Sequence, residues 1–155
     1  MRYVLVALLL AAALLMAAAQ PEGYAYYNSA QLKSYEQKLA PKVNALKFAT
    51  EVIGKFNTHA FQATFRKGSG EAELHETQHD IFIVQSGGAT LVVGGKVMKG
   101  RSTGPGEIRG TSIEGGTKQK LGPGDVVNIP NNTAHQVLLD PGQTFTYVIV
   151  KVNAK

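Results

Sequence analysis

The sequence predicts an all-β barrel or sandwich that follows a short helical segment, and three observations support this class. From residue 59 onward apolar and polar residues alternate with a period of two, as they do in Phe61–Arg66. Short β-prone runs recur at regular intervals from there on, and Gly, Pro and Asn separate them. The 155 residues include no cysteine, so the core of this single domain must come from packing without disulfides.

The first nineteen residues differ from the rest of the chain. Arg2 precedes an unbroken apolar run from Val4 to Met16, and Ala17–Ala19 offers the small residues that a signal peptidase reads. This plan predicts a signal peptide over residues 1–19, and hence an exported protein, periplasmic or secreted, with no membrane attachment after cleavage. The alternative is an uncleaved anchor helix, although the run is near the short end of the roughly 17–25 residues that a bilayer requires.

Residues 20–58 are expected to form a helical segment that covers one face of the domain. Ser29 can cap a helix over Ala30–Ala40, in which apolar residues recur at helical spacing. Val43–Ile53 predicts a second short helix, with Gly54 as its C-cap. A helix that binds a partner protein is the functional alternative for this segment.

Residues 59–155 form the predicted barrel domain. The dipeptide Gly94-Gly95 is a two-residue hairpin signal, so the strands on either side of it should pair with each other. The strands predicted here are Phe61–Arg66, Ala72–Glu76, Asp80–Val84, Ala89–Val93, Lys96–Met98, Thr117–Leu121, Asp125–Ile129, His135–Leu139 and Phe145–Val152.

Lys99–Gly116 is rich in Gly, Ser and Thr and is predicted to form a long loop with at most one short strand. Loops of this length in compact domains are uncommon and are often functional. The segment also carries Glu107, Arg109 and Glu114, which a mere linker would not need. We therefore expect a functional loop over one end of the barrel.

The net charge of +5 comes from basic residues that are spread along the chain. A nucleic-acid-binding domain would concentrate them in a stripe, and the sequence has neither a Lys/Arg run nor basic residues interleaved with aromatic ones. We therefore expect no nucleic-acid partner. The expected partner is a small-molecule ligand, with a homodimer left open.

A dense run of acids and histidines lies at Glu71–Asp80. Residues two apart in a strand face the same side, so Glu73 and His75 point together. If that side is the barrel interior, their charges are costly to bury unless they are paired or bound to a metal. His75–His79 also spells the zincin pattern, which requires a helix. Between β-prone runs we interpret that match as accidental, and a polar turn is the alternative for the whole run.

Gly124, Pro130 and His135 mark a second segment that runs strand, turn, histidine. In order and spacing they resemble the second motif of the cupin superfamily. Asn132 stands in place of the turn glycine, which is tolerable because Asn also visits positive φ, and Leu139 replaces the final asparagine. The chain is thus similar to small, single-domain, type 2-like cupins. The resemblance implies a cupin-type double-stranded β-helix, or jelly-roll barrel.

The first cupin motif fits more loosely and is counted back from its closing glycine, Gly87. Asp80 lies seven residues earlier, at the acid position, and His75 falls on the second histidine. Glu73 replaces the first histidine. A slip of one position would bring His79 inward instead, but it would lose the register with Gly87. We therefore expect Asp80 to face the pocket.

By this resemblance Glu73, His75, Asp80 and His135 would bind one divalent metal ion. Two imidazoles and two carboxylates suit Mn, Fe, Zn or Ni. A metal-free polar cavity is the alternative, and His59 is expected to lie at a strand end or on the surface. Other side chains that could reach the pocket mouth, although the spacing does not place them there, are Arg66, Arg101, Arg109, Glu114 and Lys120.

Cupins share a fold but include dioxygenases, isomerases, lyases and decarboxylases, so the resemblance does not choose a reaction. The first hypothesis is an exported metal-dependent enzyme, an oxygenase, isomerase or lyase, that acts on a small polar organic molecule. The second is a non-catalytic module that binds a small molecule or a sugar. The third is a stable barrel with only an assembly role.

Overall fold

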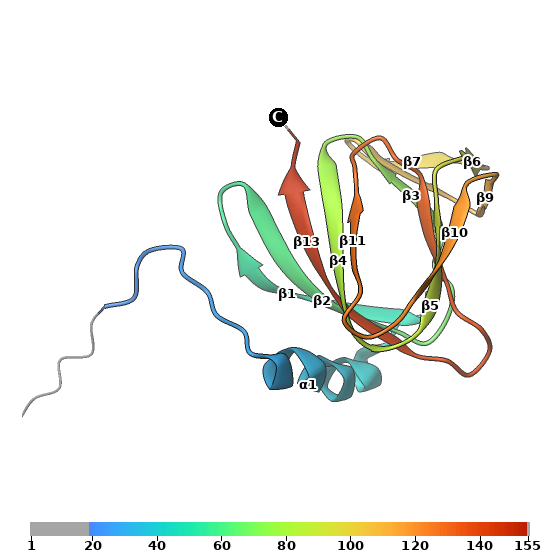
Figure 1. Cartoon of the computed structure of the whole chain (residues 1–155). Helices are drawn as coiled ribbons and strands as arrows, with labels where there is room; N and C mark the ends of the chain where they lie inside the picture. The colour runs from blue at the N-terminus through green and yellow to red at the C-terminus, as the bar shows by residue number, and fades with distance from the viewer. Residues whose placement is uncertain (1–18, 155) are drawn as a thin grey trace, which may run out of the picture.

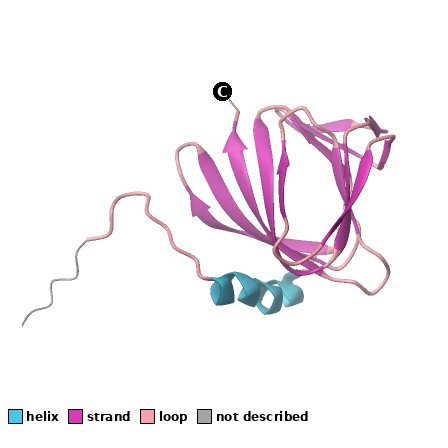
Figure 2. Ribbon diagram, viewed as in Figure 1, coloured by secondary structure: helices cyan, strands magenta, loops and turns pink. Residues whose placement is uncertain are grey.

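Two antiparallel sheets face each other in the computed structural model, which describes residues 19–154 (Figures 1 and 2). The first sheet has the order β1-β2-β13-β4-β11, the second has the order β10-β5-β12-β3-β8-β7, and β6 pairs with β9 in a small third sheet. The predicted all-β barrel is therefore confirmed. The elements are α1 (Ser29–Leu39), η1 (Ala40–Lys42), β1 (Phe48–Lys55), β2 (His59–Arg66), β3 (Ala72–His75), β4 (Gln78–Gly87), β5 (Ala89–Val93), β6 (Lys96–Met98), β7 (Arg101–Gly104), β8 (Glu107–Gly110), β9 (Ser112–Glu114), β10 (Thr117–Leu121), β11 (Val126–Ile129), β12 (His135–Leu138) and β13 (Phe145–Asn153).

The predicted signal peptide lies outside the described residues, apart from its last position. Between residues 19 and 154, no helix combines the length and the apolar character that crossing a membrane requires.

Helix α1 lies on the outer face of the first sheet (Figure 1). Its N-cap is Asn28 rather than the predicted Ser29, because the Asn28 side chain accepts the N–H of Gln31 while the Gln31 side chain accepts the N–H of Asn28. Leu39 is buried against Ala49 and other apolar residues of the sheet. The helix thus covers one sheet face, as the sequence predicts.

The predicted second helix, Val43–Ile53, is wrong, because most of this segment belongs to strand β1. Strand β1 pairs with β2 from Phe48↔Arg66 to Lys55↔Ala60. Short apolar runs fit both helical and strand periods, and here pairing to the neighbouring strand decides the conformation.

The predicted hairpin across Gly94-Gly95 is also wrong. Strand β5 pairs with β10 and β12, whereas β6 pairs with β9. Both glycines have positive φ, 80° and 75°, as a tight turn requires. The turn is therefore real, but it sends the chain from the second sheet into the small third sheet.

The predicted loop, Lys99–Gly116, contains strands β7, β8 and β9. Strand β8 pairs with β3 along its length, from Ala72↔Gly110 to His75↔Glu107. These strands carry little of the apolar alternation by which a strand is recognised in a sequence, because they lie at the margin of the barrel. The segment is therefore not a loop: β7 and β8 belong to the second sheet, and β9 belongs to the small third sheet.

Strand β2 shows why the barrel contains a polar cavity. Its polar residues Gln62, Thr64 and Arg66 line the cavity, whereas Phe65 packs outward against Leu39 of α1. The other part of the interior is filled by a buried apolar cluster. That cluster comprises Phe82, Val84, Ala89, Leu91, Leu121, Ile129, Val137, Phe145, Tyr147 and Ile149.

Candidate metal centre

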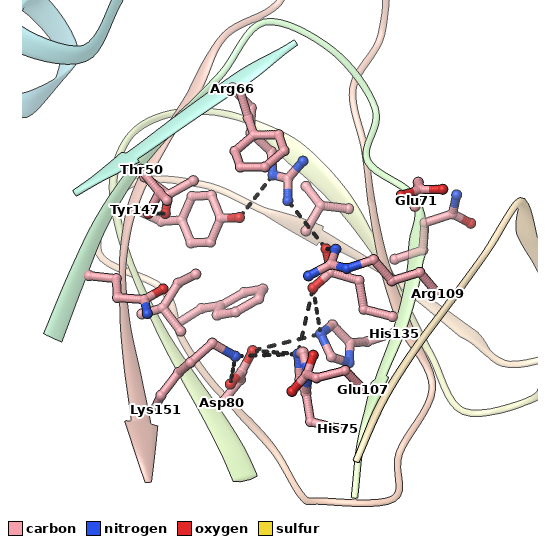
Figure 3. Close-up of a pocket in the computed structure, with 18 residues that line it drawn as sticks. Thr50, Arg66, Glu71, His75, Asp80, Glu107, Arg109, His135, Tyr147 and Lys151 are labelled. Atoms are coloured by element: carbon pink, nitrogen blue, oxygen red, sulfur yellow. Dashed lines mark hydrogen bonds and ion pairs between the residues drawn. The ribbon is translucent and has the colours of Figure 1, made fainter. Parts of the chain in front are cut away.

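A cavity of about 240 Å³ lies between the two sheets, and charged side chains from both sheets surround it (Figure 3). Its volume is below the roughly 300–1,000 Å³ that is usual for ligand sites, so a ligand would have to be small. The charged, imidazole and phenol side chains of the lining are Arg66, Glu71, Glu73, His75, Asp80, Glu107, Arg109, His135, Tyr147 and Lys151.

The second sheet presents two rows of side chains to this cavity. In the first row Arg109 of β8, Glu73 of β3 and His135 of β12 stand side by side, because Glu73 is in register with both neighbours. In the second row His75 is paired with Glu107. Residues 73 and 75 share one face of β3, as the strand period predicts.

The first sheet contributes Asp80, which lies opposite Lys151 of β13. Asp80 is 2% exposed and lines the cavity, as the count from Gly87 predicts. His79 lies outside the cavity lining, and its Nδ1 accepts the backbone N–H of Asn131 at 3.1 Å. Gly87 itself has φ 74°, and a Cβ there would lie 1.9 Å from the Thr144 carbonyl oxygen, so no other residue fits.

The four residues predicted as metal ligands all line this cavity, and Figure 3 labels three of them, His75, Asp80 and His135. His75 Nε2 lies 3.6 Å from Glu73 Oε2 and 3.4 Å from Asp80 Oδ2. His135 Nε2 lies 3.9 Å from Glu73 Oε2 and 3.8 Å from Asp80 Oδ2. Potential ligand atoms of Glu73, His75 and His135 all lie within 4.8 Å of one another.

Both imidazoles are held by their Nδ1 atoms. Nδ1 of His75 lies 2.7 Å from Glu107 Oε2, and Nδ1 of His135 lies 3.1 Å from the Thr133 carbonyl oxygen. Because a carboxylate and a carbonyl only accept, each Nδ1 must donate. Among residues 19–154, the buried Nε2 of His135 has no hydrogen-bond partner. Metal-binding histidines typically show this arrangement, with one nitrogen anchored and the other directed at the ion.

The two histidines have opposite electrostatic settings. For His75, burial lowers the pKa, but hydrogen bonds to Asp80 and Glu73 outweigh it and raise the pKa to about 9. For His135, burial dominates and the pKa lies below its ordinary value. At neutral pH the metal-free cavity therefore holds one charged imidazole and one neutral imidazole.

Both carboxylates stay ionised despite burial. Burial raises the pKa of Glu73, but the hydrogen bond to His75 and the positive charge of Arg109 bring it well below its usual value. Burial likewise raises the pKa of Asp80, and the contacts with His75 and Lys151 lower it overall. The cavity therefore offers two negatively charged oxygen donors beside two imidazoles.

Each carboxylate also contacts a cation through its other oxygen, the one that is not paired with the imidazoles. Arg109 Nη1 lies 2.5 Å from Glu73 Oε1, and Lys151 Nζ lies 2.8 Å from Asp80 Oδ1. Lys151 Nζ is also 3.3 Å from His75 Nε2. A metal ion near that nitrogen would therefore meet the positive charge of Lys151.

The donor set fits a divalent transition metal. Two imidazole nitrogens and a carboxylate that leave positions open are typical of non-haem iron sites and also suit Mn, Zn and Ni. The unpartnered Nε2 of His135 is the atom that most requires a ligand, because a buried polar atom without a partner is costly.

The remaining sequence predictions have mixed outcomes. Of the side chains considered for the pocket mouth, Arg66 and Arg109 line the cavity, whereas Arg101, Glu114 and Lys120 do not. Glu107, from the predicted functional segment, also lines it. His59 lies outside the cavity lining and stacks on Phe56, with ring centroids 4.7 Å apart.

Sequence reasoning missed Lys151 and Tyr147 as cavity residues. The signal was present in β13, where Tyr147, Ile149 and Lys151 alternate with Val148 and Val150. In the second motif, by contrast, Asn132 has φ 57°, as expected for a residue in the place of a turn glycine.

No family model matches the sequence, and no curated protein matches it either. Solved structures do match. A protein from Thermus thermophilus, TT1209, is 15% identical with a TM-score of 0.54, over 77% of this chain and 94% of that one. The nucleoside dehydratase Pac13 from Streptomyces is 11% identical with a TM-score of 0.51, over 72% and 74% of the two chains.

The polyketide cyclase RemF from Streptomyces resistomycificus is 19% identical with a TM-score of 0.50. The match covers 70% of this chain and 66% of the cyclase, which is just under two thirds of that protein. Identities this low show a shared fold and nothing about the reaction. The chain has the predicted cupin-type double-stranded β-helix, or jelly-roll barrel, with a short N-terminal helical segment.

Proposed function

We propose that this protein is an exported metal-dependent enzyme that acts on a small polar organic molecule. His75, His135 and Glu73 would hold one Mn, Fe, Zn or Ni ion, and Asp80 would complete the shell. The observation that carries the proposal is the buried, unpartnered Nε2 of His135, which faces two carboxylate oxygens and lies beside a second imidazole.

When bound, such an ion supplies Lewis acidity to a carbonyl or hydroxyl oxygen of the substrate. Side chains and backbone groups of the protein would orient the ligands and the substrate. Glu107 and the Thr133 carbonyl fix the direction of the two imidazoles. Lys151, whose side chain is 17% exposed, can donate to a substrate oxygen. Phe82 and Ile149 line the same space and would make part of its wall apolar.

Two further arguments support an exported enzyme. Structures with this fold include a polyketide cyclase and a nucleoside dehydratase, which favours catalysis over a purely structural role. The predicted signal peptide supports export to the periplasm or the medium. N-terminal mass measurement on protein recovered from outside the cytoplasm tests that point, and a chain that begins at Gln20 is the expected result.

A non-catalytic binding module is the second candidate, and one observation favours it. Each acid near the imidazoles already has a positively charged or imidazole partner, namely Arg109 for Glu73, Lys151 for Asp80 and His75 for Glu107. A cavity that is neutralised internally can hold a ligand without any ion.

Metal loading separates the two candidates. The mature protein is incubated in turn with Mn, Fe, Zn and Ni, dialysed, and examined by elemental analysis. We expect close to one ion per chain for one of these metals. His135→Ala and His75→Ala should each lose most of it, because each removes a nitrogen ligand, and His59→Ala is the matched control. Retention of well under one ion per chain for every metal would make the binding module the better account.

A further inference from the structure

We propose that Arg66 and Arg109 form a carboxylate-binding subsite at the end of the cavity away from His75 and Asp80 (Figure 3). The inference deepens the proposed function and rests on it for the role of the cavity, since it names the substrate class as small monocarboxylic acids. It concerns different residues from the candidate metal centre, with Glu73 as the one shared side chain.

Arg66 is a buried cation whose donors are incompletely used. Its side chain is 8% exposed, and its Nε donates to Tyr147 Oη at 2.9 Å. The nearest carboxylate oxygen, Glu73 Oε1, lies 3.8 Å from Nη2, which is an ion pair but too long for a hydrogen bond. Within the described part of the chain neither Nη atom makes a hydrogen bond, and neither is fully enclosed, so their N–H groups are open to a ligand.

A nearly buried guanidinium with unused donors gains from any acceptor that reaches it, whether a ligand or water. Arg66 is held in its position by its surroundings. The Phe48 ring lies under its guanidinium carbon, 5.0 Å away, and a Cβ on Gly70 would lie only 2.6 Å from Nη1. The glycine thus leaves the room that the guanidinium occupies, and the Arg66 donors are pre-positioned for a ligand.

Arg109 provides the second guanidinium. Its Nη1 lies 2.5 Å from the same oxygen, Glu73 Oε1, and its side chain is 30% exposed. One carboxylate oxygen therefore serves two cations, while the other oxygen of Glu73 faces the imidazoles. The two arginines and Glu73 carry a net charge of +1.

The neighbouring acid does not cancel this charge. Glu71 lies 2.9 Å from Arg101, which is outside the cavity. Lys151 and Asp80 form their own pair, and His75 pairs with Glu107. One unit of positive charge at the arginine end is therefore left for a ligand to balance.

A carboxylate meets these requirements better than a phosphate. It is planar and can accept two parallel N–H bonds from a guanidinium. Its single charge matches the excess of one, whereas a phosphate dianion would exceed it. The cavity volume of about 240 Å³ limits the acid to a small one.

The test measures acid binding to the mature protein freed of metal with EDTA. Acetate, pyruvate, lactate and benzoate are titrated calorimetrically, each beside its neutral amide. We expect at least one acid to bind about tenfold or more tightly than its amide, because the arginines make charge-assisted hydrogen bonds only to the acid. Arg66→Met and Arg109→Met should each lower the affinity for that acid by about tenfold, whereas Arg101→Met should change this affinity by less than about twofold.

Controls keep the test independent of folding and of the metal. Arg66→Met leaves Tyr147 Oη without its partner, so Arg109→Met, on a partly exposed side chain, provides a second reading that disturbs the core less. Arg66→Met should retain metal binding, and His135→Ala should retain acid binding in EDTA. Loss of metal binding with intact acid binding would overturn the proposed function alone.

Three outcomes overturn the carboxylate subsite. One is that no acid binds more tightly than its amide, with or without metal. Another is that both arginine variants bind acids as the unmodified protein does. The third is acid binding that requires the metal and survives both variants, since it would place the carboxylate on the ion.

Discussion

The two ends of the cavity differ in what they lack. At the imidazole end His75, His135 and Asp80 are each at most 3% exposed. The Nε2 atom of His135 there has a lone pair with no hydrogen-bond donor or cation to accept it. At the arginine end the Nη donors of Arg66 have no hydrogen-bond acceptor among the described residues, but they are not fully enclosed. This difference fits the proposed ligand, which would bind the metal ion at one end and place its carboxylate on the arginines at the other. Glu73 lies between the two ends, with one oxygen near the arginines and the other near the imidazoles.

The largest expected effect comes from Glu73→Gln, because this change acts on both ends at once. It leaves two guanidiniums beside a neutral amide, and breaking a buried ion pair on one side costs roughly 3–5 kcal/mol. We expect the free energy of unfolding in EDTA to fall by about 2–4 kcal/mol, since Glu73 is 16% exposed. Denaturant unfolding measures it, with exposed Glu76→Gln as control. A loss as small as that of the control would show that the two ends are not joined through Glu73.

A pH dependence should distinguish the ends, because the strongly shifted imidazole belongs to one of them. The pKa of His75 is raised from 6.5 to about 9. A group with a raised pKa stabilises the fold fully below its unfolded pKa and loses that contribution as pH rises through the folded pKa. Metal-free protein should therefore lose roughly 1–3 kcal/mol of stability between about pH 6.5 and 9.5.

To isolate the contribution of His75, the free energy of unfolding is measured by denaturant over the same pH range for His75→Gln and for the unmodified protein. The stability of the variant should change less than that of the unmodified protein over this range. Parallel curves for the two proteins would mean that His75 does not titrate as described.

Lys151→Met tests the imidazole end by removing its nearest cation. The ammonium of Lys151 lies 3.3 Å from His75 Nε2, so its removal should raise metal affinity by about tenfold through the loss of a like charge. Competition with a fluorescent chelator measures it, and Lys118→Met, at an exposed site, is the control. Weaker metal binding instead would show that Lys151 positions Asp80 as a ligand.

The smallest expected effect is that of His79→Ala, which changes the residue next to Asp80. Its imidazole lies outside the cavity and accepts one backbone N–H. We expect metal affinity to change by less than about twofold and stability to fall by about 1 kcal/mol, the usual value of one hydrogen bond. A large loss of metal affinity would show that His79 is a metal ligand.

Much of the fold could be predicted because strand alternation and turn chemistry are local properties. The alternation in Phe61–Arg66 and the motif glycine Gly87 are visible in the sequence itself. Strand pairing is not local, and for that reason the local pattern predicts the wrong neighbour for β5 and a helix over Val43–Ile53. In both places a short segment fits two structures, and contacts with distant strands select one of them.

The candidate site was predictable only in part. His75, Asp80 and His135 were found because they occur in motifs with fixed spacing. Arg66 and Lys151 belong to no motif, and they reach the cavity only because the polar faces of β2 and β13 turn inward. The sequence predicts that a helix covers one face of the domain, but it does not predict that this helix packs on the apolar face of β2.

The central claim is that one ion binds between His75, His135 and Glu73. Anomalous diffraction from crystals of the protein without residues 1–19, soaked in Mn²⁺, tests it most directly. We expect a single strong peak within bonding distance of both Nε2 atoms and a Glu73 oxygen. A peak held instead by His59 or His79, or no peak in this cavity at saturating Mn²⁺, would contradict it.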